Sequence, residues 1–290
     1  TLSKIGYIVK QMENKSEIKY ITDKKMELEE FIKLETMKVE FLSNMSHEFR
    51  TPINIILAIV QLLNLHNKPL GDEKYKEYLN ILKQNSYRLL RLVNNVMDIT
   101  KVNSDSHKLN LVNCNIVSVL EEIVMSTVLY ASEKKRNIIF DTDSEEIILA
   151  CDEDKIERIM LNLISNAIKF SQLHTDIEIK IKRNVDLNRV YISVKNYGSN
   201  IEFNDREKIF ERFHRVDNSL NRKNEGCGIG LFLCRKFIEM HGGEIFLDNI
   251  DNGTQFSFYL PINITSEKIY NPLMQKDSLI EKCNIEFSDI

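Results

Sequence analysis

A histidine followed directly by a glutamate lies in the twelve-residue run Phe41–Pro52, inside a stretch whose apolar spacing predicts a long helix. Near pH 7 an imidazole such as His47 is neutral and nucleophilic, and the carboxylate of Glu48 can take up the proton that the ring loses. Proline inside a helix clashes with the carbonyl four residues earlier, so Pro52 predicts a bend beside this pair. A zinc-protease helix is excluded, because H-E-x-x-H needs a second histidine where Thr51 stands. An exposed histidine without chemistry is the remaining alternative.

A second set of polar residues forms a stripe on an otherwise apolar predicted helix. Asn162, Asn166 and Lys169 follow one another at i, i+4 and i+7, a spacing that places them on one helix face. Asparagines that cap or bridge structure, beside an ordinary exposed lysine at the helix end, would give the same pattern. The spacing alone therefore leaves this candidate site undecided.

A third candidate is the glycine run Gly226, Gly228 and Gly230, which opens a predicted helix. Glycines there let backbone N–H groups approach a phosphate, and the helix N-terminus adds partial positive charge. The run differs from the dinucleotide-binding G-x-G-x-x-G, and the sequence has no G-x-x-x-x-G-K-[ST]. A plain loop is the alternative, because G-x-G-x-G alone is a weak motif.

The elements that must position these residues begin with two long helices. Residues 24–65 and 72–101 have helical apolar spacing and are separated by a turn at 66–71, which predicts an antiparallel helical hairpin. Each helix has only a narrow apolar seam, so a dimer that forms a four-helix bundle is the expected way to bury both seams. A polar linker follows at residues 103–108.

After the linker, helices mix with strands that resemble antiparallel hairpins, which predicts an α+β domain with helices on one face of a sheet. Helices are expected at residues 116–133, 154–170 and 230–240, and strands at 138–140, 147–150, 177–182, 190–194, 244–248 and 254–260. Residues 1–25 are ambiguous: Ile5, Tyr7 and Val9 alternate as in a short strand, yet they are too few to decide. Residues 262–290 carry no readable pattern.

Composition narrows the classes of function. The 290 residues include 39 Lys and Arg against 43 Asp and Glu, and the net charge of -4 argues against general nucleic-acid binding. Uninterrupted apolar runs fall far short of the roughly 20 residues that span a bilayer. The five cysteines contain no C-x-x-C pair, which favours a reduced compartment over disulfides or zinc. We expect this region to be cytoplasmic, with any membrane contact made by parts outside this chain.

The run Phe41–Pro52 resembles the phosphoacceptor box of bacterial sensor histidine kinases throughout their pattern F-L-x-N-x-S-H-E-x-R-T-P. The resemblance implies that His47 accepts the γ-phosphoryl group of ATP, with Glu48 as its general base. Thr51 lies one helical turn after the histidine. In many kinases of this type that residue positions a water for dephosphorylating the partner.

The polar stripe resembles the asparagine box of the same kinases, whose Bergerat-type ATP-binding fold is shared by Hsp90-, gyrase- and MutL-type ATPases. By this match Asn166 gives its side-chain oxygen to Mg²⁺, while Asn162 and Lys169 face the phosphates. Phe170, which follows Lys169, is also predicted to contact the nucleotide. One amide ligand makes chemical sense, because Mg²⁺ fills its shell with phosphate oxygens and water.

The glycine run resembles the second glycine box of the family. The resemblance implies that Gly226, Gly228, Gly230 and Leu231 bind the nucleotide. Cys227 stands where a small hydroxyl residue is common, and redox regulation through its thiol is a further hypothesis.

The first glycine box departs from the family pattern D-x-G-x-G. Asn196 replaces the aspartate that accepts a hydrogen bond from the adenine amino group, and Asn200 replaces the second glycine, while Gly198 is kept. An amide can accept from that amino group while it donates to a ring nitrogen, and asparagine tolerates positive φ. We therefore expect ATP binding to survive. Thr254 matches the threonine that helps to hold adenine through water.

The segment between the glycine boxes carries two further features. Residues 209–213 resemble the phenylalanine box, and residues 217–225 form a polar stretch suited to a mobile lid over the nucleotide. Arg215 and Lys223 are candidates to reach the phosphates. Solvated loop cations are the alternative for both.

All boxes follow the family's order within residues 36–261. The resemblance implies a dimeric, Mg·ATP-dependent protein-histidine kinase that passes its phosphoryl group from His47 to an aspartate of a response regulator. The expected domains are a segment at 1–27 that could end an upstream sensor, a dimerisation and phosphotransfer hairpin at 28–102, the linker at 103–108, an α/β-sandwich catalytic domain at 109–261 and a tail at 262–290.

Two alternatives remain open. A phosphatase-biased weak kinase is motivated by Asn196, Asn200 and Cys227, which depart from the family pattern. A non-catalytic, nucleotide-gated dimeric scaffold would show no turnover at all. One autophosphorylation assay with Mg·ATP separates these alternatives from a competent kinase.

Overall fold

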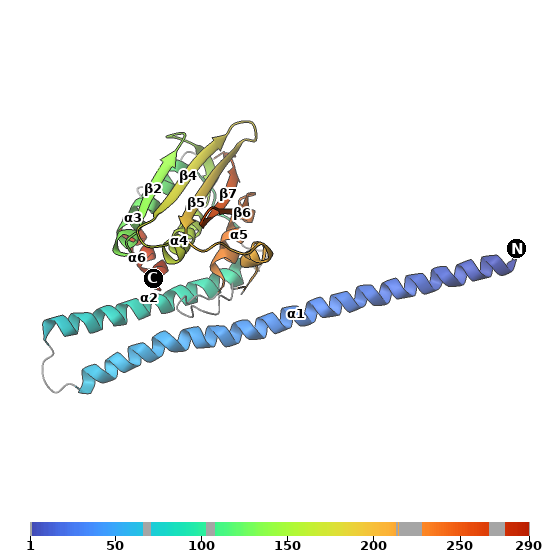
Figure 1. Cartoon of the computed structure of the whole chain (residues 1–290), viewed down its shortest axis with the longest axis horizontal. Coiled ribbons are helices and arrows are strands. Elements are labelled where there is room, and N and C mark those ends of the chain that lie inside the picture. The colour runs from blue at the N-terminus through green and yellow to red at the C-terminus, as the bar shows by residue number, and fades with distance from the viewer. Residues whose placement is uncertain are drawn as a thin grey trace. The chain divides into compact units, whose positions relative to one another are not determined.

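The structure is a computed structural model that describes residues 2–65, 71–102, 108–212, 214, 228–266 and 276–289. The chain divides into two compact units, residues 1–47 and residues 48–290. The first unit is a stretch of helix, and the second contains a helical hairpin and an α/β domain (Figure 1).

Helix α1 (Leu2–Leu65) makes up the first unit, continues into the second, and runs through Pro52 without a break. The strand-like alternation that begins at Ile5 is therefore misleading, because residues 2–25 are helical. The surrounding sequence explains this outcome. It is rich in Lys and Glu, which favour helix, and no proline precedes Pro52.

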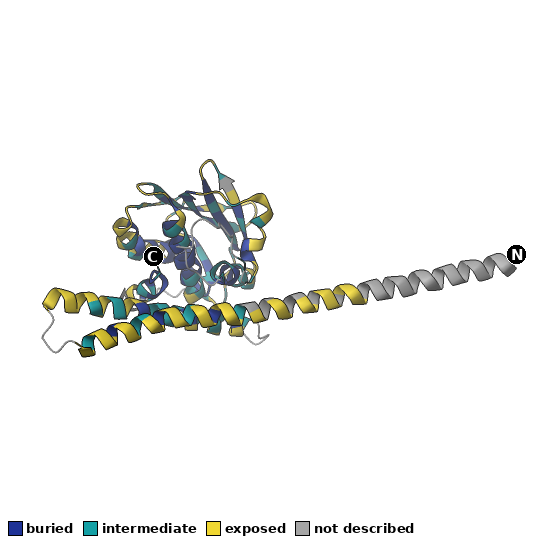
Figure 2. Ribbon diagram, turned by 60° about the horizontal axis from the view of Figure 1, so that its bottom comes forward, coloured by how far each residue is buried: buried dark blue, intermediate teal, exposed yellow. Residues whose placement is uncertain are grey.

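In the second unit, the end of α1 and helix α2 (Asp72–Val102) form the predicted hairpin. Its buried apolar residues include Ile59, Leu92 and Ile99. Other large apolar side chains of the same helices are exposed: Ile53, Leu57, Val60, Leu79, Leu90, Val93 and Met97. Figure 2 marks exposed residues of both helices in yellow. A single hairpin therefore leaves an extended apolar surface uncovered.

The α/β domain contains a five-stranded sheet of order β2-β4-β5-β7-β6 and a small sheet of β1 and β3. The strands are β1 (Val112–Asn115), β2 (Asn137–Thr142), β3 (Ile148–Cys151), β4 (Asp176–Asn184), β5 (Arg189–Tyr197), β6 (Glu244–Ile250) and β7 (Gly253–Pro261). Every neighbouring pair is antiparallel except β2 and β4, which are parallel. The antiparallel hairpins that the sequence predicts are present, but β2 pairs in parallel. Its connection to β4 passes through β3 and helix α4 (Glu153–Phe170), a crossover long enough for a parallel pair.

Helices α3 (Ile116–Glu133), α4 and α5 (Gly230–Met240) cover one face of the large sheet, as predicted (Figure 1). Alternate residues of the strands point into the layer between sheet and helices. A row of four such residues crosses neighbouring strands and is at most 3% exposed: Ile181, Ile192, Phe258 and Ile245. This row forms the centre of the core, and the helix that carries the polar stripe packs against it.

The sequence just before α4 fixes where that helix begins. Asp152 accepts a hydrogen bond from the backbone N–H of Lys155, which is an N-cap. Glu153 and Asp154 then place negative charge in the first turn, where the helix dipole favours it. These signals set the register of α4 and therefore the face on which its polar stripe lies.

The tail contains helix α6 (Lys276–Glu286), which no pattern in the sequence had indicated. The helix packs against α2, α3 and α4, and the buried apolar residues of this segment are Leu279, Cys283, Ile285 and Phe287. Their spacing mixes intervals of four and two residues, so they form no regular helical stripe in the sequence. Burial of each large side chain stabilises the packed tail by about 1.5–3 kcal/mol, and α6 is therefore held on the domain by apolar packing.

Two short 3-10 turns, Phe203–Asp205 and Lys208–Phe210, follow β5. Phe210, from the run that resembles the phenylalanine box, is buried and packs edge-on against Phe256 with 6.2 Å between the ring centres. None of the helices in the described ranges combines the length and apolar character needed to cross a bilayer.

Candidate active site

The proposed phosphoacceptor His47 lies on α1 as an exposed residue, and Thr51 is also exposed one turn later. Helical spacing places the two side chains on the same face of α1. The adjacent Ser46 hydroxyl donates to the Leu42 carbonyl at 2.7 Å, within the helix itself. An exposed imidazole meets the first requirement for a nucleophile, which is access by a second reactant.

Glu48, the proposed general base, is paired with a residue that carries no motif in the sequence. Arg88 of α2 brings its Nη2 to 3.7 Å from Glu48 Oε2, and the two side chains are 15% and 19% exposed. An ion pair shielded to this degree is screened less by salt than one on an open surface. The second helix of the hairpin therefore positions the carboxylate beside the histidine.

The polar stripe on α4 lies as its spacing predicted. Asn162 is buried, and Asn166 and Lys169 are partly buried. Asn166 donates from Nδ2 to Asn162 Oδ1 at 3.2 Å, so its own carboxamide oxygen is not used in that bond. Phe170 follows at the helix end and is half exposed. An amide oxygen and an ammonium group on one face are a suitable donor set for a magnesium–phosphate ligand.

Asn196 and Thr254 face each other across β5 and β7. Both are buried, and the Thr254 hydroxyl donates to Asn196 Oδ1 at 3.0 Å. Thr254 thus makes a direct hydrogen bond to Asn196, the residue that stands in place of the family aspartate. A carboxamide oxygen has two lone pairs, so Asn196 can accept a second hydrogen bond from an adenine amino group.

Positions 198 and 200 of the first glycine box differ in whether the backbone requires a glycine there. A Cβ at Gly198 would lie 2.2 Å from the carbonyl oxygen of Phe170, so the close approach of β5 to the end of α4 requires glycine there. Asn200 is exposed, and it is not among the described non-glycine residues with positive φ. The loss of the second glycine at this position therefore creates no backbone strain.

The N-terminus of α5 abuts the polar stripe. A Cβ at Gly230 would lie 2.2 Å from Asn162 Nδ2, so the glycine allows the two helices to meet at the asparagine. The N-cap residue is Ile229, whose apolar side chain has no group to cap the first amides. Gly228 and Leu231 lie on either side of this helix start and are partly buried. Backbone N–H groups at a helix N-terminus suit an anion.

Several predicted residues lie outside the described part of the chain. They are Arg215, Lys223, Gly226 and Cys227, together with the proposed lid at residues 217–225. Their roles remain predictions. Within the described ranges, no group of three or more His, Cys, Asp or Glu side chains could hold a metal ion.

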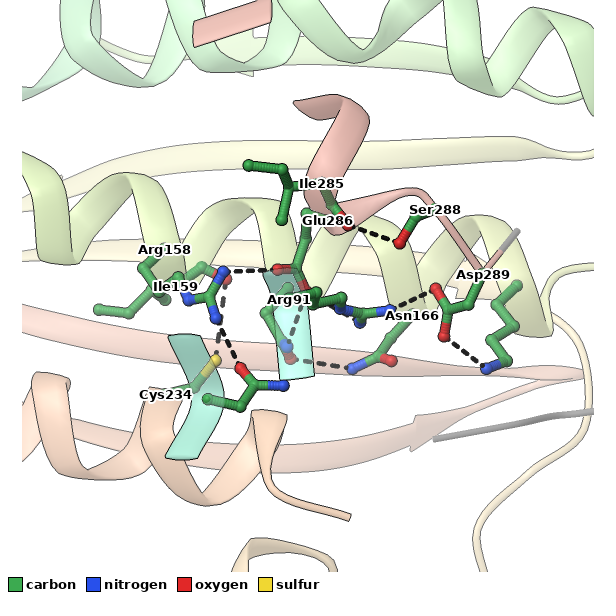
Figure 3. A network of polar contacts seen from close by, with 12 residues as sticks. Arg91, Arg158, Ile159, Asn166, Cys234, Ile285, Glu286, Ser288 and Asp289 are labelled. Carbon is green, nitrogen blue, oxygen red and sulfur yellow. Dashed lines mark hydrogen bonds and ion pairs between the residues drawn. The ribbon is translucent and has the colours of Figure 1, made fainter. Parts of the chain in front are cut away.

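Two carboxylates from the tail lie on the polar stripe, and neither was predicted from the sequence (Figure 3). Asn162 Nδ2 donates to Glu286 Oε1 at 3.4 Å, and Lys169 Nζ lies 3.3 Å from Asp289 Oδ2. Arg91 of α2 pairs with both carboxylates, and Arg158 of α4 pairs with Glu286 at 2.7 Å. This face of α4 therefore binds anionic oxygens in the folded chain.

The charges of this cluster alter the pKa values of its members. Burial alone would raise the pKa of Asp289, but the cations Arg91 and Lys169 outweigh it and lower that pKa below its ordinary value. Burial alone would likewise lower the pKa of Arg91, but Glu286 and Asp289 outweigh it and raise that pKa. Arg91 and Asp289 are therefore both charged near neutral pH.

Comparison with known proteins finds a family match for the helical hairpin and another for the α/β domain. Residues 37–105 match the His Kinase A (phospho-acceptor) domain, and residues 151–264 match the histidine kinase-, DNA gyrase B-, and HSP90-like ATPase. The chain is 32% identical over 259 residues to the hybrid signal transduction histidine kinase D of Dictyostelium discoideum. The aligned region covers 87% of this chain and 17% of that protein. The chain is 31% identical over 233 residues to the sensor histidine kinase WalK of Bacillus subtilis, which covers 79% of this chain and 37% of that protein.

Among solved structures, histidine kinase ThkA in complex with response regulator protein TrrA is similar, with a TM-score of 0.59 and 27% identity over 77% of this chain and 61% of that one. The chain spans less than half the length of the Dictyostelium and Bacillus relatives. With a phosphoacceptor domain followed by an ATPase domain of this type, the chain belongs to the sensor histidine kinase family.

Proposed function

We propose that this chain is an ATP-dependent protein-histidine kinase that phosphorylates His47 and passes the phosphoryl group to an aspartate of a response regulator. The observation that carries the proposal is the exposed His47 beside Glu48, which Arg88 holds in place from the second helix of the hairpin. The match of this region to a phospho-acceptor domain supports the same role.

Nucleotide binding is assigned to the polar stripe of α4, together with the ends of β5 and β7 and the start of α5. Asn196 and Thr254 would hold adenine, while Asn162, Lys169 and the first amides of α5 would hold the phosphates. Support comes from the anion-binding character of this face, on which two carboxylates already lie. Asn166 would give its amide oxygen to Mg²⁺, which neutralises phosphate charge when it is bound.

In the proposed reaction, a ring nitrogen of His47 forms a bond to the γ-phosphorus while the bond from that phosphorus to the bridging oxygen breaks. ADP leaves with the electron pair of that bond, and Glu48 accepts the proton that the imidazole loses. Phosphoryl transfer needs positioning and charge neutralisation more than covalent help from the protein. Lys169 supplies part of that charge, and the Arg88 contact supplies part of the positioning.

We further propose that the chain acts as a homodimer that meets a response-regulator receiver domain. The apolar residues Leu57, Val60, Leu90 and Val93 are exposed on the hairpin, and a second hairpin would cover them. Light scattering should give twice the mass of one chain, and a monomer would contradict the proposal. The similarity to the complex of ThkA with TrrA supports a regulator as the second partner.

The proposal is tested by incubating the full chain with Mg²⁺ and γ-labelled ATP. Label should appear on the wild-type chain and be lost from His47→Gln, while both bind nucleotide. Label that persists on the variant would refute His47 as the acceptor. Nucleotide binding without any label would favour the scaffold.

A phosphatase bias remains a second candidate function. Thr51 is exposed one turn after His47, where it can position a water against a bound phosphoaspartate. Feeble labelling of the chain, combined with rapid Thr51-dependent loss of phosphate from a receiver domain, would favour this alternative.

A further inference from the structure

The tail that follows the catalytic domain is docked by a defined apolar surface. Phe287 stacks on Tyr130 of α3 with ring centres 4.9 Å apart, and the Tyr130 hydroxyl donates to Asn284 Oδ1 at 3.0 Å. Leu279 and Ile285 are also buried. Because apolar packing and a specific hydrogen bond act together, the position of α6 does not depend on charge alone.

The docked segment places Glu286 among cations and amides of the nucleotide side. Its side chain is 2% exposed and lies 2.9 Å from Arg91 Nη2 and 2.7 Å from Arg158 Nη1. Asn162 Nδ2 completes the set at 3.4 Å. Figure 3 shows this carboxylate between the two guanidinium groups. A buried carboxylate of this kind needs its partners, because loss of one leaves an uncompensated charge.

Asp289, three residues later, occupies the other end of the same stripe. One carboxylate oxygen lies 3.3 Å from Lys169 Nζ, and the other pairs with Arg91. The backbone carbonyl of Ser288 between them accepts from Gln84 Nε2 at 3.3 Å. Two anionic groups thus lie on the two ends of the stripe that the proposed function assigns to the phosphates.

We propose that the segment Lys276–Asp289 is an autoinhibitory element that competes with the nucleotide phosphates for Asn162 and Lys169. The inference rests on the proposed function, since it requires that this face of α4 binds phosphate. A single ammonium group and a single amide cannot satisfy the tail carboxylates and a triphosphate in the same place. Nucleotide binding and tail docking therefore exclude each other.

The same contacts tie the hairpin to the catalytic domain. Arg91 comes from α2 and holds both tail carboxylates, and Arg158 of α4 also bonds to Asn95 Oδ1 at 2.5 Å and lies 3.6 Å from Asp98 Oδ2. The docked tail adds two further charges to this junction. Release of the tail would remove these two charges from the junction and would also free Asn162 and Lys169 for the phosphates.

The test compares the full chain with the double variant Glu286→Gln/Asp289→Asn, which keeps side-chain size and removes both charges. Mg·ADP affinity, measured by calorimetry, should rise by about tenfold, a coupling typical of linked sites. Labelling from γ-labelled ATP should accelerate in parallel. The matched control is Glu281→Gln, which removes an exposed carboxylate from the same helix and should leave both values unchanged.

The outcomes separate the inference from the proposed function. If wild type and double variant bind Mg·ADP equally well, the tail does not compete and the inference is wrong, while the kinase proposal stands. If neither binds nucleotide although both are folded by circular dichroism, the proposed function fails, and the inference fails with it.

Hydrogen exchange of the unmodified chain gives a second measurement that needs no variant. Saturating Mg·ADP should speed exchange in residues 276–289, because bound phosphate displaces the carboxylates. Unchanged protection of this segment at saturating nucleotide would overturn the inference.

Discussion

At the scale of single residues, the proposed phosphoacceptor His47 and its neighbour Glu48 differ in how far they are buried. His47 is exposed, whereas the neighbouring Glu48 is partly buried against Arg88. The sequence predicted the first two residues as a pair from their adjacency. It could not predict Arg88, because that residue lies forty positions away and only the fold of the hairpin brings it to the carboxylate.

Replacement of Arg88 tests whether it positions the proposed base. General base catalysis contributes about 10²- to 10⁴-fold, so Glu48→Gln should slow labelling of His47 within that range. Arg88→Met keeps the apolar stem and should slow labelling less than Glu48→Gln does, with nucleotide affinity unchanged. The control is Lys76→Met on the exposed part of α2. Equal labelling rates for Arg88→Met and wild type would remove Arg88 from the mechanism.

His241 provides a prediction about pH. Its Nε2 accepts from the Asp152 N–H at 3.0 Å, so the ring is neutral and Nδ1–H donates to the Phe237 carbonyl at 2.6 Å. Burial lowers the pKa of His241 below its ordinary value. Near pH 6.5 the unfolded chain therefore binds a proton that the folded chain does not. The neutral His241 therefore contributes fully to stability above about pH 6.5, the ordinary pKa of histidine. This contribution is lost as the pH falls below that value toward the lowered pKa of the folded chain.

Urea unfolding measures this effect. The urea concentration at the midpoint of unfolding should decrease when the pH is lowered from about 7.5 to about 5.5. The variant His241→Asn should show a smaller decrease. His174→Asn replaces an exposed histidine and should retain the full decrease. An equal pH dependence in both variants and in wild type would show that His241 is not responsible.

Whole elements were predicted well where local signals are strong. Helices α3 and α5 have the predicted bounds, and α4 begins one residue earlier than predicted, behind its Asp152 cap. The parallel pairing of β2 with β4 was missed, because alternation within a strand does not reveal the direction of its neighbour. Helix α6 was missed because its buried residues follow no helical period.

The close contact between β5 and the end of α4 predicts that replacement of Gly198 destabilises the fold. Gly198→Ala would place a Cβ against the Phe170 carbonyl oxygen, which belongs to backbone and cannot rotate away. We expect a loss of about 1–3 kcal/mol in the free energy of unfolding, as for other overpacked sites. Gly71→Ala is the control, since a Cβ there would meet nothing within 4 Å. Similar stabilities of the two variants would contradict the close approach of β5 to α4.

At the scale of the whole molecule, the site combines residues that are far apart in the sequence. The motifs of the sequence indicated α4, β5, β7 and the start of α5, and these elements meet in the fold. Arg91 and Glu286 carry no recognisable motif, and they reach the site only because helix α6 of the tail packs against both α2 and α4. Chemistry that depends on such packing is therefore invisible until the chain is folded.

The most direct test of the proposed kinase maps the phosphoryl group itself. Wild type and the variant Glu286→Gln/Asp289→Asn are incubated with Mg·ATP, and peptides kept near neutral pH are analysed by mass spectrometry. We expect a phosphoryl group on the imidazole of His47 in both, with more on the variant. A phosphoryl group on another residue, or an unmodified His47 in chains that bind nucleotide, would contradict the proposed mechanism.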